Sequence, residues 1–178
     1  MIAWLSRLMR LAIFRRRHSQ ILWPKAMFAG RGTKVAVTGG GTLRSGENLD
    51  LVNLADILVK FNTLLTGRNT NIEIGAVISC REAIFIGDNA LIAEHVTIRD
   101  QDHNFRHAFV TVQAGFTTAT IAIGDNVWID MKATVTKGVT VGDNVVMDAN
   151  SVVTPDITSN SVAVGVPARV VNLIGGNA

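Results

Sequence analysis

The sequence predicts an all-β solenoid, a fold in which short strands and turns wind into stacked coils. One tetrapeptide, Ile/Val-Gly-Asp-Asn, occurs at residues 86–89, 123–126 and 141–144, and the last two copies start 18 residues apart. Stepping by six over residues 74–98 and 117–153 also gives Ile or Val at nine of twelve positions. This period does not match the 3.6 residues of a helical turn, whereas strands that end in Gly, Asp and Asn, which tolerate positive φ, accommodate it.

Three six-residue rungs would form one 18-residue coil of triangular section, with the repeat positions, among them Ile74, Cys80 and Thr117, pointing inward. Twelve such rungs give four coils within residues 74–158. The two series are in phase only if residues 104–116 leave the coil as an extruded loop. A loop of this length in a compact fold is usually functional.

The chain divides into a basic arm over residues 1–34, a β-helix domain over 35–161 that is less regular at 35–73, and a cap over 162–178. The arm holds eight Lys or Arg and no acidic residue, whereas the remainder holds nine basic and fourteen acidic residues. Apolar residues recur at helical spacing over residues 2–14, which predicts a short amphipathic helix.

Three interpretations of the arm remain open. The helix packs on the body or on another subunit, or residues 1–17 lie on an anionic membrane surface with Trp4 among the lipids and the arginines at the headgroups. The third interpretation is nucleic-acid binding, but no base-reading fold or aromatic stacking platform accompanies the basic residues. We therefore expect no nucleic-acid partner.

The composition excludes several classes of protein. Hydrophobic residues make up 48% of the chain, which is too apolar for a disordered protein. Cys80 is the only cysteine, so a disulfide scaffold is excluded and a reducing compartment is favoured. No apolar run approaches the roughly 20 residues of a spanning helix. We expect a cytoplasmic protein, with peripheral contact at the inner face of the cytoplasmic membrane if the arm binds lipid.

The hexapeptide repeat and three segments resemble the left-handed β-helix acyltransferases. These segments are VTIRDQDH at residues 96–103, IGDNVWI at 123–129 and SVAVGVPARV at 161–170. Within that family, the chain is most similar to the galactoside and maltose O-acetyltransferases and to the bacterial capsule and lipopolysaccharide O-acetyltransferases. The resemblance implies left-handed coils, a homotrimer with acetyl-CoA as co-substrate in clefts between subunits, and direct acetyl transfer to a hydroxyl group without a covalent enzyme intermediate.

His103 matches the catalytic histidine of this family. It closes the last rung before the extruded loop, where a neutral imidazole could take the proton of an attacking sugar hydroxyl. Asp102 directly precedes it at an expected inward position, where an unpaired carboxylate would be costly, so it either turns outward or helps to orient the imidazole. Asp100 and Glu94 are the other candidates for the orienting carboxylate.

The resemblance also assigns ligand-binding residues. Trp128 matches a tryptophan beside the acyl acceptor and the pantetheine arm, with a partly exposed aromatic at a trimer interface as the alternative. CoA contacts are implied for Ala149, Thr154 and Arg169. Met131 replaces a small hydroxyl residue and Pro155 replaces a lysine of the galactoside branch, so we expect these contacts to differ in detail.

The family's acceptor-binding Asn and Asp correspond to the stretch that holds Glu73 and Arg81, so that role is not transferred. We expect an acetyl-CoA-dependent O-acetyltransferase that acts on a sugar hydroxyl, in a surface polysaccharide or its precursor, and that needs no metal. Serine or amino-sugar acyl transfer and a non-catalytic scaffold are the alternatives. A γ-type carbonic anhydrase would need zinc on His95, His103 and His107, whose spacing differs from that family's.

Overall fold

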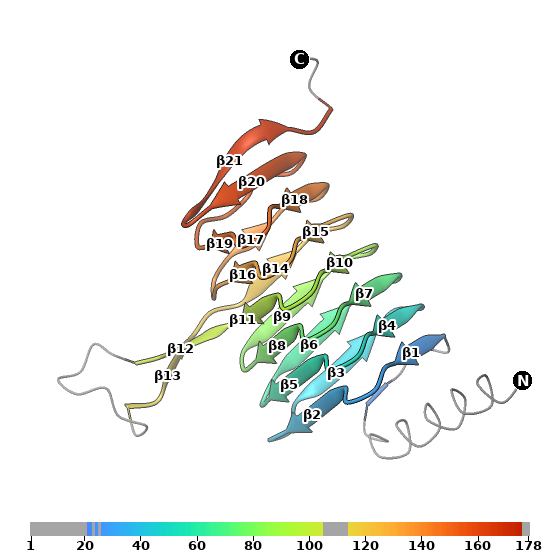
Figure 1. Ribbon diagram of the computed structural model, residues 1–178. Coiled ribbons are helices and arrows are strands. Elements are labelled where there is room, and N and C mark those ends of the chain that lie inside the picture. Colours follow the sequence, from blue (N-terminus) through green and yellow to red (C-terminus); the bar gives the residue numbers. More distant parts are fainter. Residues whose placement is uncertain (1–20, 23, 25, 105–113, 176–178) are drawn as a thin grey trace, which may run out of the picture.

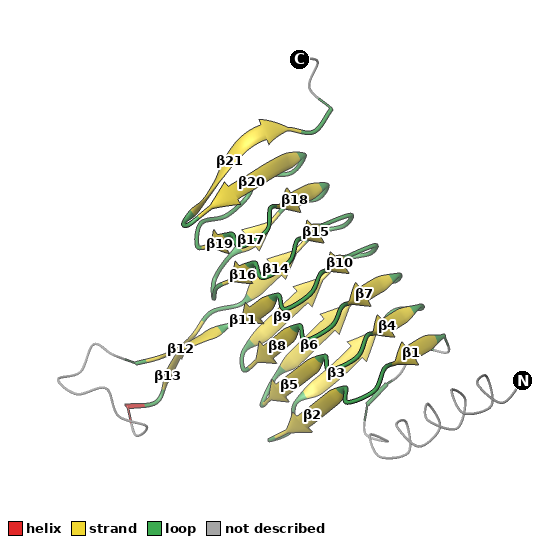
Figure 2. Ribbon diagram, in the orientation of Figure 1, coloured by secondary structure: helices red, strands yellow, loops and turns green. Residues whose placement is uncertain are grey.

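The computed structural model describes residues 21, 22, 24, 26–104 and 114–175. It confirms the predicted all-β solenoid: the coils stack from β1 at one end to β20 and β21 at the other (Figure 1). Strands make up nearly all of the regular structure, and short turns join them (Figure 2). The predicted helix over residues 2–14 lies outside the described residues, as does His107 of the predicted loop.

Each coil contributes one strand to each of three sheets, so the chain winds around a three-sided core. The eight-stranded sheet contains β1 (Met27–Ala29), β4 (Leu49–Leu51), β7 (Thr70–Ile72), β10 (Leu91–Ile92), β15 (Trp128–Ile129), β18 (Val145–Met147), β20 (Ser161–Gly165) and β21 (Ala168–Leu173). The six-stranded sheet contains β2 (Lys34–Thr38), β5 (Asp56–Lys60), β8 (Val77–Cys80), β11 (Thr97–Arg99), β16 (Thr134–Val135) and β19 (Val152–Val153). The five-stranded sheet contains β3 (Thr42–Ser45), β6 (Thr63–Thr66), β9 (Ala83–Ile86), β14 (Ile121–Ile123) and β17 (Thr140–Val141).

Columns of aliphatic side chains fill the core along the solenoid axis. One column runs through the six-stranded sheet, where parallel pairing aligns Ile57, Ile78, Ile98, Val135 and Val153. Each of these side chains is at most 2% exposed. Full burial of a side chain of this size contributes about 1.5–3 kcal/mol relative to an exposed one, so each added coil extends a continuous apolar core.

The repeated tetrapeptide forms one corner of the prism, the first corner, between the five-stranded and eight-stranded sheets. The asparagines of this corner, in the tetrapeptide and in the coils before it, adopt positive φ and form ladders in which one side-chain amide donates to the next: Asn48 to Asn69 at 2.8 Å, and Asn126 to Asn144 at 3.1 Å. The aspartates accept backbone N–H groups of the neighbouring coil, as Asp143 does from Asp125 at 2.8 Å. The repeat therefore satisfies backbone donors that a corner would otherwise leave unpaired.

The remaining corners lie between the eight- and six-stranded sheets (the second corner) and between the six- and five-stranded sheets (the third corner). Near the N-terminal end, equivalent corner residues are 20 to 22 positions apart, against 16 to 18 beyond the hairpin. Because these coils are longer, the position six residues before Cys80 no longer falls on an inward-facing site. Cys80 is fully buried as predicted, but the predicted inward position of Ile74 is wrong, because this side chain is 38% exposed. The neighbouring Ile72 is buried instead.

The coils extend further toward the N-terminus than the repeat indicated. β1 pairs with β4 in parallel register, and β2 begins at Lys34, so the first coil starts within the segment that the sequence assigned to the arm. Residues 35–73, which the sequence left unassigned, form regular coils around the same core. The six-stranded sheet takes one strand from each coil, which gives six coils: the four predicted within residues 74–158 and two that precede them.

Two paired strands flank the predicted loop over residues 104–116, and Phe116 already belongs to the second of them. β12 (Gln101–His103) and β13 (Phe116–Thr118) pair antiparallel and project sideways from the middle of the stack (Figure 1). The coil closes beneath them, because the Ala119 N–H donates to the Asp100 carbonyl at 3.0 Å. Thr117 is consequently exposed on the hairpin, and its predicted inward position is wrong.

The C-terminal residues form the cap. β20 continues the eight-stranded sheet in parallel with β18, and β21 folds back antiparallel on β20. The segments described here include no helix of the length and apolar character needed to cross a membrane.

Candidate active site

His103 lies on the extruded hairpin, at the end of β12, with an exposed side chain. β12 pairs it with Phe116 on β13, and the two rings stack at an angle of 38° with their centroids 4.3 Å apart. Among the described residues, no carboxylate or carbonyl group is recorded as a hydrogen-bond partner of this imidazole. Both ring nitrogens are therefore open to groups that approach from outside the subunit fold.

Arg81 lies on the other side of the same phenylalanine ring. Its guanidinium carbon is 3.6 Å from the centroid of Phe116 and 6.0 Å from that of Phe61, which belongs to the preceding coil. A cation over an aromatic face contributes about 0.5–2 kcal/mol. Phe61, Arg81, Phe116 and His103 thus form a column of stacked planar groups, the aromatic column, which ties the hairpin to the third corner.

Asp100 anchors the base of the hairpin. Its carboxylate is fully buried and accepts the Arg81 N–H at 2.8 and 3.0 Å and the Glu82 N–H at 2.7 Å. These bonds use the carboxylate to hold the backbone of the preceding coil, and they leave it no recorded contact with His103. The expectation that Asp100 orients the imidazole therefore has no support within one subunit.

Asp102 points outward, which corrects its predicted inward position. Its side chain is 47% exposed, and its Oδ2 lies 2.9 Å from the Lys137 Nζ. The outward alternative holds because Asp102 follows the point at which the chain leaves the coil. Glu94 lies on the second corner, where its carbonyl accepts the Lys132 N–H at 2.9 Å. Neither carboxylate has a recorded contact with His103.

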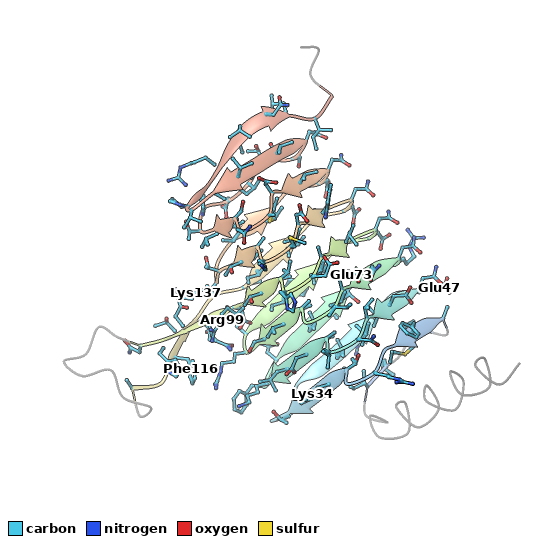
Figure 3. All side chains as sticks on the ribbon, viewed as in Figure 1. Lys34, Glu47, Glu73, Arg99, Phe116 and Lys137 are labelled. Atoms are coloured by element: carbon cyan, nitrogen blue, oxygen red, sulfur yellow. The ribbon has the colours of Figure 1, made fainter. Side chains whose placement is uncertain are left out.

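Cationic side chains lie on the same side of the solenoid as the aromatic column. Figure 3 shows Arg99, Lys137 and Phe116 on the side from which the hairpin projects, whereas Glu47 and Glu73 lie on the far side in this view. Arg99 is exposed at the end of β11. The sequence did not single out Phe116 or Arg99. An aromatic residue at the far end of the loop, in a chain with only 6% aromatics, was the available signal for Phe116.

Trp128 begins β15 in the eight-stranded sheet, between Leu91 and Val146 of the adjacent strands. Its side chain is 43% exposed, as expected for a ring that faces a ligand or another subunit. β11, which leads to His103, belongs to a different sheet. One subunit therefore places its own His103 and Trp128 on different sides of the solenoid.

The predicted CoA contacts lie in the last coils. Ala149 is part of the second corner, where the Asn150 N–H donates to the Met131 carbonyl at 2.9 Å, so Ala149 stacks next to Met131. The tip of the β20–β21 hairpin reaches the same corner, because the Gly165 N–H donates to the Ser151 Oγ at 3.1 Å. Arg169 lies beside this tip with an exposed side chain.

Thr154 follows β19, at the opposite edge of the six-stranded sheet from the second corner, and its side chain is exposed. The chemistry of this set fits CoA. Ala149 presents only a methyl group, so a pantetheine arm can approach the backbone, and Arg169 is a cation with no recorded carboxylate partner among the described residues. Met131, 42% exposed, adds apolar surface where the galactoside branch has a small hydroxyl residue.

No group of three or more His, Cys, Asp or Glu suited to a metal ion occurs in the described part of the chain. His95 lies on the second corner against Gly75, away from the hairpin that carries His103.

A family model described as bacterial transferase hexapeptide (six repeats) matches residues 120–155. A maltose O-acetyltransferase from Clostridium difficile 630 is 31% identical, and its match covers 81% of this chain and 71% of that one with a TM-score of 0.61. A galactoside acetyltransferase, solved in complex with coenzyme A, is 31% identical over 82% of this chain and 65% of its own, with a TM-score of 0.54.

A third solved structure is that of the polySia-specific acetyltransferase NeuO. It is 26% identical, and the match covers 85% of this chain and 71% of that one with a TM-score of 0.70. The chain spans little more than half the length of the curated relatives it matches, 57% of one and 53% of another.

Proposed function

The chain belongs to the hexapeptide-repeat acetyltransferases, and on that premise we propose that it transfers the acetyl group of acetyl-CoA to a hydroxyl group of a sugar. The observation that carries this proposal is the setting of His103. The imidazole is exposed, held by ring stacking with Phe116, and free of a hydrogen-bond partner among the described residues. A general base needs this combination of fixed position and open nitrogen.

The neutral imidazole of His103 accepts the proton of the acceptor hydroxyl while that oxygen attacks the thioester carbonyl. A tetrahedral intermediate forms, and its collapse breaks the carbon–sulfur bond. The imidazolium then returns the proton to the departing thiolate, so the histidine ends in its initial state. General-base help of this kind contributes about 10²–10⁴ in rate, and backbone N–H groups near the thioester would stabilise the oxyanion.

Acetyl-CoA supplies the activated acyl group. Ala149 and Thr154 are the residues that would line the pantetheine arm, and Arg169 would hold a phosphate group. Met131 would shield the thioester from water on its apolar side. Trp128 would pack against the acceptor and the pantetheine arm, as the matching residue does in the family.

A homotrimer is part of the proposal. His103 and Trp128 of one subunit lie on different sides of its solenoid, so an active site that uses both requires two copies of the chain. The orienting carboxylate for His103, for which a single subunit offers no contact, would then be supplied by a neighbouring subunit or by the acceptor.

We assign the acceptor to a surface polysaccharide or its precursor, and the protein to the cytoplasm. The similarity to NeuO, a polySia-specific acetyltransferase, supports this assignment. Residues 1–17 of the basic arm would bring the enzyme to the inner face of the cytoplasmic membrane, where lipid-linked intermediates are assembled. Flotation of the full chain with anionic liposomes, compared with a chain that lacks residues 1–17, tests the membrane contact, and equal flotation contradicts it.

The test of the activity compares the wild type with His103→Ala. We expect the rate of acetyl transfer to oligosaccharide acceptors, measured through the release of CoA, to fall by about 10²–10⁴. Affinity for CoA, measured by calorimetry, and the trimeric mass should stay unchanged, because the side chain is exposed. Full activity of the variant would remove His103 from the mechanism. If only serine or the nitrogen of an amino sugar were acetylated, that group would replace the sugar hydroxyl as the proposed acceptor. If no acceptor were acetylated, a non-catalytic scaffold would be favoured.

A further inference from the structure

Two guanidinium groups near the base of the hairpin have no recorded carboxylate partner in the described parts of the chain. Arg81 is partly buried between Phe116 and Phe61, and Arg99 is exposed at the end of β11. The ion pairs recorded for the described residues join Arg68 to Asp88 and Lys137 to Asp102, and neither involves these two arginines. Neither guanidinium group is therefore in a recorded ion pair within the described residues, and both can form one with a ligand.

The acidic groups nearby are already engaged. Asp100 is buried and accepts the backbone N–H groups of Arg81 and Glu82. The Glu82 carboxylate accepts the Thr120 hydroxyl at 3.2 Å, and Asp102 pairs with Lys137. None of these three carboxylates has a recorded contact with either guanidinium.

The aromatic column fixes how Arg81 presents its donors. The guanidinium carbon lies 3.6 Å from the Phe116 ring centroid, so the Phe116 ring covers one face of the guanidinium group. The Asp100 carboxylate fixes the Arg81 backbone from the other side. The N–H groups at the guanidinium edge remain, and this planar fork matches the geometry of a carboxylate or phosphate, whereas a neutral hydroxyl offers only one acceptor at a time.

The guanidinium group of Arg81 lies close to His103, the proposed general base. Phe116 contacts Arg81 on one side and His103 on the other, with a ring-to-ring distance of 4.3 Å to the histidine. An anionic group held by Arg81 would thus lie about one sugar ring away from the imidazole. The anion and the reacting hydroxyl can belong to the same sugar or to adjacent sugars.

We propose that the acceptor is an anionic glycan, whose carboxylate or phosphate group is bound by Arg81 with help from Arg99 while a nearby hydroxyl faces His103. This inference rests on the proposed function and specifies its substrate class. Arg81 acts as a specificity-determining residue: it selects the charged acceptor and orients its hydroxyl.

The test uses the full-length protein, acetyl-CoA and matched acceptors. The panel pairs oligosaccharides that contain glucuronic or N-acetylneuraminic acid with their carboxyl-reduced forms, and phosphorylated oligosaccharides with their dephosphorylated forms. We expect the charged member of a pair to be acetylated at least about ten times more efficiently. The carboxylate and phosphate arms distinguish the two sources of the anion.

Three variants locate the effect. Arg81→Gln should lower the preference for the charged member about 10- to 100-fold, mainly through KM, and Arg81→Lys should restore only part of it because lysine lacks the planar fork. Arg99→Gln, which leaves the aromatic column intact, should lower the same preference by a smaller factor. Arg31→Gln removes an equal charge from an exposed position on the second corner and should change nothing.

The outcomes separate this inference from the proposed function. Acetylation of charged and reduced members with equal efficiency, or an unchanged preference in both Arg81→Gln and Arg99→Gln, overturns the anionic acceptor and leaves O-acetyl transfer standing. If no carbohydrate in the panel accepts an acetyl group while the protein binds acetyl-CoA, the proposed function fails and the inference fails with it.

Discussion

The first and third corners of the solenoid both turn the chain from one sheet to the next, but the first does so with repeated residues and the third with different residues in each coil. At the first corner, successive coils use the same residues, so that Asn stacks on Asn and Asp binds the backbone of the neighbouring coil. The third corner changes from coil to coil: Gly40, Phe61, Arg81 and Asp100 follow one another, and then the hairpin emerges. Repetition at one corner secures the stack, which leaves the other corner free to carry chemistry.

The comparison predicts that a methyl group has different effects at the two corners. A Cβ on Gly124 would meet the Asp143 backbone nitrogen and the Gly142 carbonyl carbon at 2.9 Å, so two coils would have to separate. We expect Gly124→Ala to lower the free energy of unfolding by about 3 kcal/mol. Gly40 has no neighbour within 4 Å of such a Cβ but has φ +81°, so Gly40→Ala should cost only about 1 kcal/mol. Thermal unfolding at fixed protein concentration measures both, and equal losses would contradict the distinction.

A smaller effect is expected where the third corner is held from inside. Asp100→Asn keeps the shape of the side chain but removes the charge that accepts the Arg81 and Glu82 N–H groups. We expect a loss of about 1–2 kcal/mol in the free energy of unfolding. The matched change Asp102→Asn affects a half-exposed ion pair and should cost less than about 1 kcal/mol. If the Asp102 variant proved the less stable of the two, the assignment of Asp100 as the anchor would be wrong.

The smallest effect concerns Cys80, just before the third corner. Burial, followed by the nearby Asp100 carboxylate, raises the pKa of its thiol from 9.0 to about 12. The thiol should therefore not react with iodoacetamide at pH 8 in the native protein, and it should react after denaturation. Because the unfolded chain loses this proton first, stability should fall as the pH rises from about 9 towards about 12. Cys80→Ala should remove this part of the alkaline dependence, and rapid labelling of the native thiol would contradict the assignment.

The sequence predicted the first corner better than the third for a physical reason. Gly, Asp and Asn recur because each coil needs the same close approach and the same positive φ, so the pattern itself states the structure. The third corner has no recurring residue, and its length varies from coil to coil. The predicted inward positions of Ile74 and Thr117 are wrong for this reason. Asp102 does not take its expected inward position for the same reason, since the chain leaves the coil between Asp100 and Asp102.

His103 could be predicted from its motif, but its surroundings could not. The contact of Arg81 with Phe116 joins the third corner to the far strand of a hairpin, and it depends on the antiparallel register of β12 and β13. No local pattern encodes that register. The expected carboxylate partner of His103 was sought among neighbours in the sequence, yet the structure commits those side chains to the Arg81 and Glu82 backbone and to Lys137.

The bond between the Ala119 N–H and the Asp100 carbonyl closes the coil across the base of the hairpin. The intervening residues leave and re-enter the solenoid at one point, and β11 and β14 pair with their neighbours above and below as if nothing had been inserted. The inserted segment can therefore be exchanged, in evolution or by design, for one of another length or composition while the coils keep their pairing. Acceptor preference can then diverge quickly among related proteins while their coils remain superimposable.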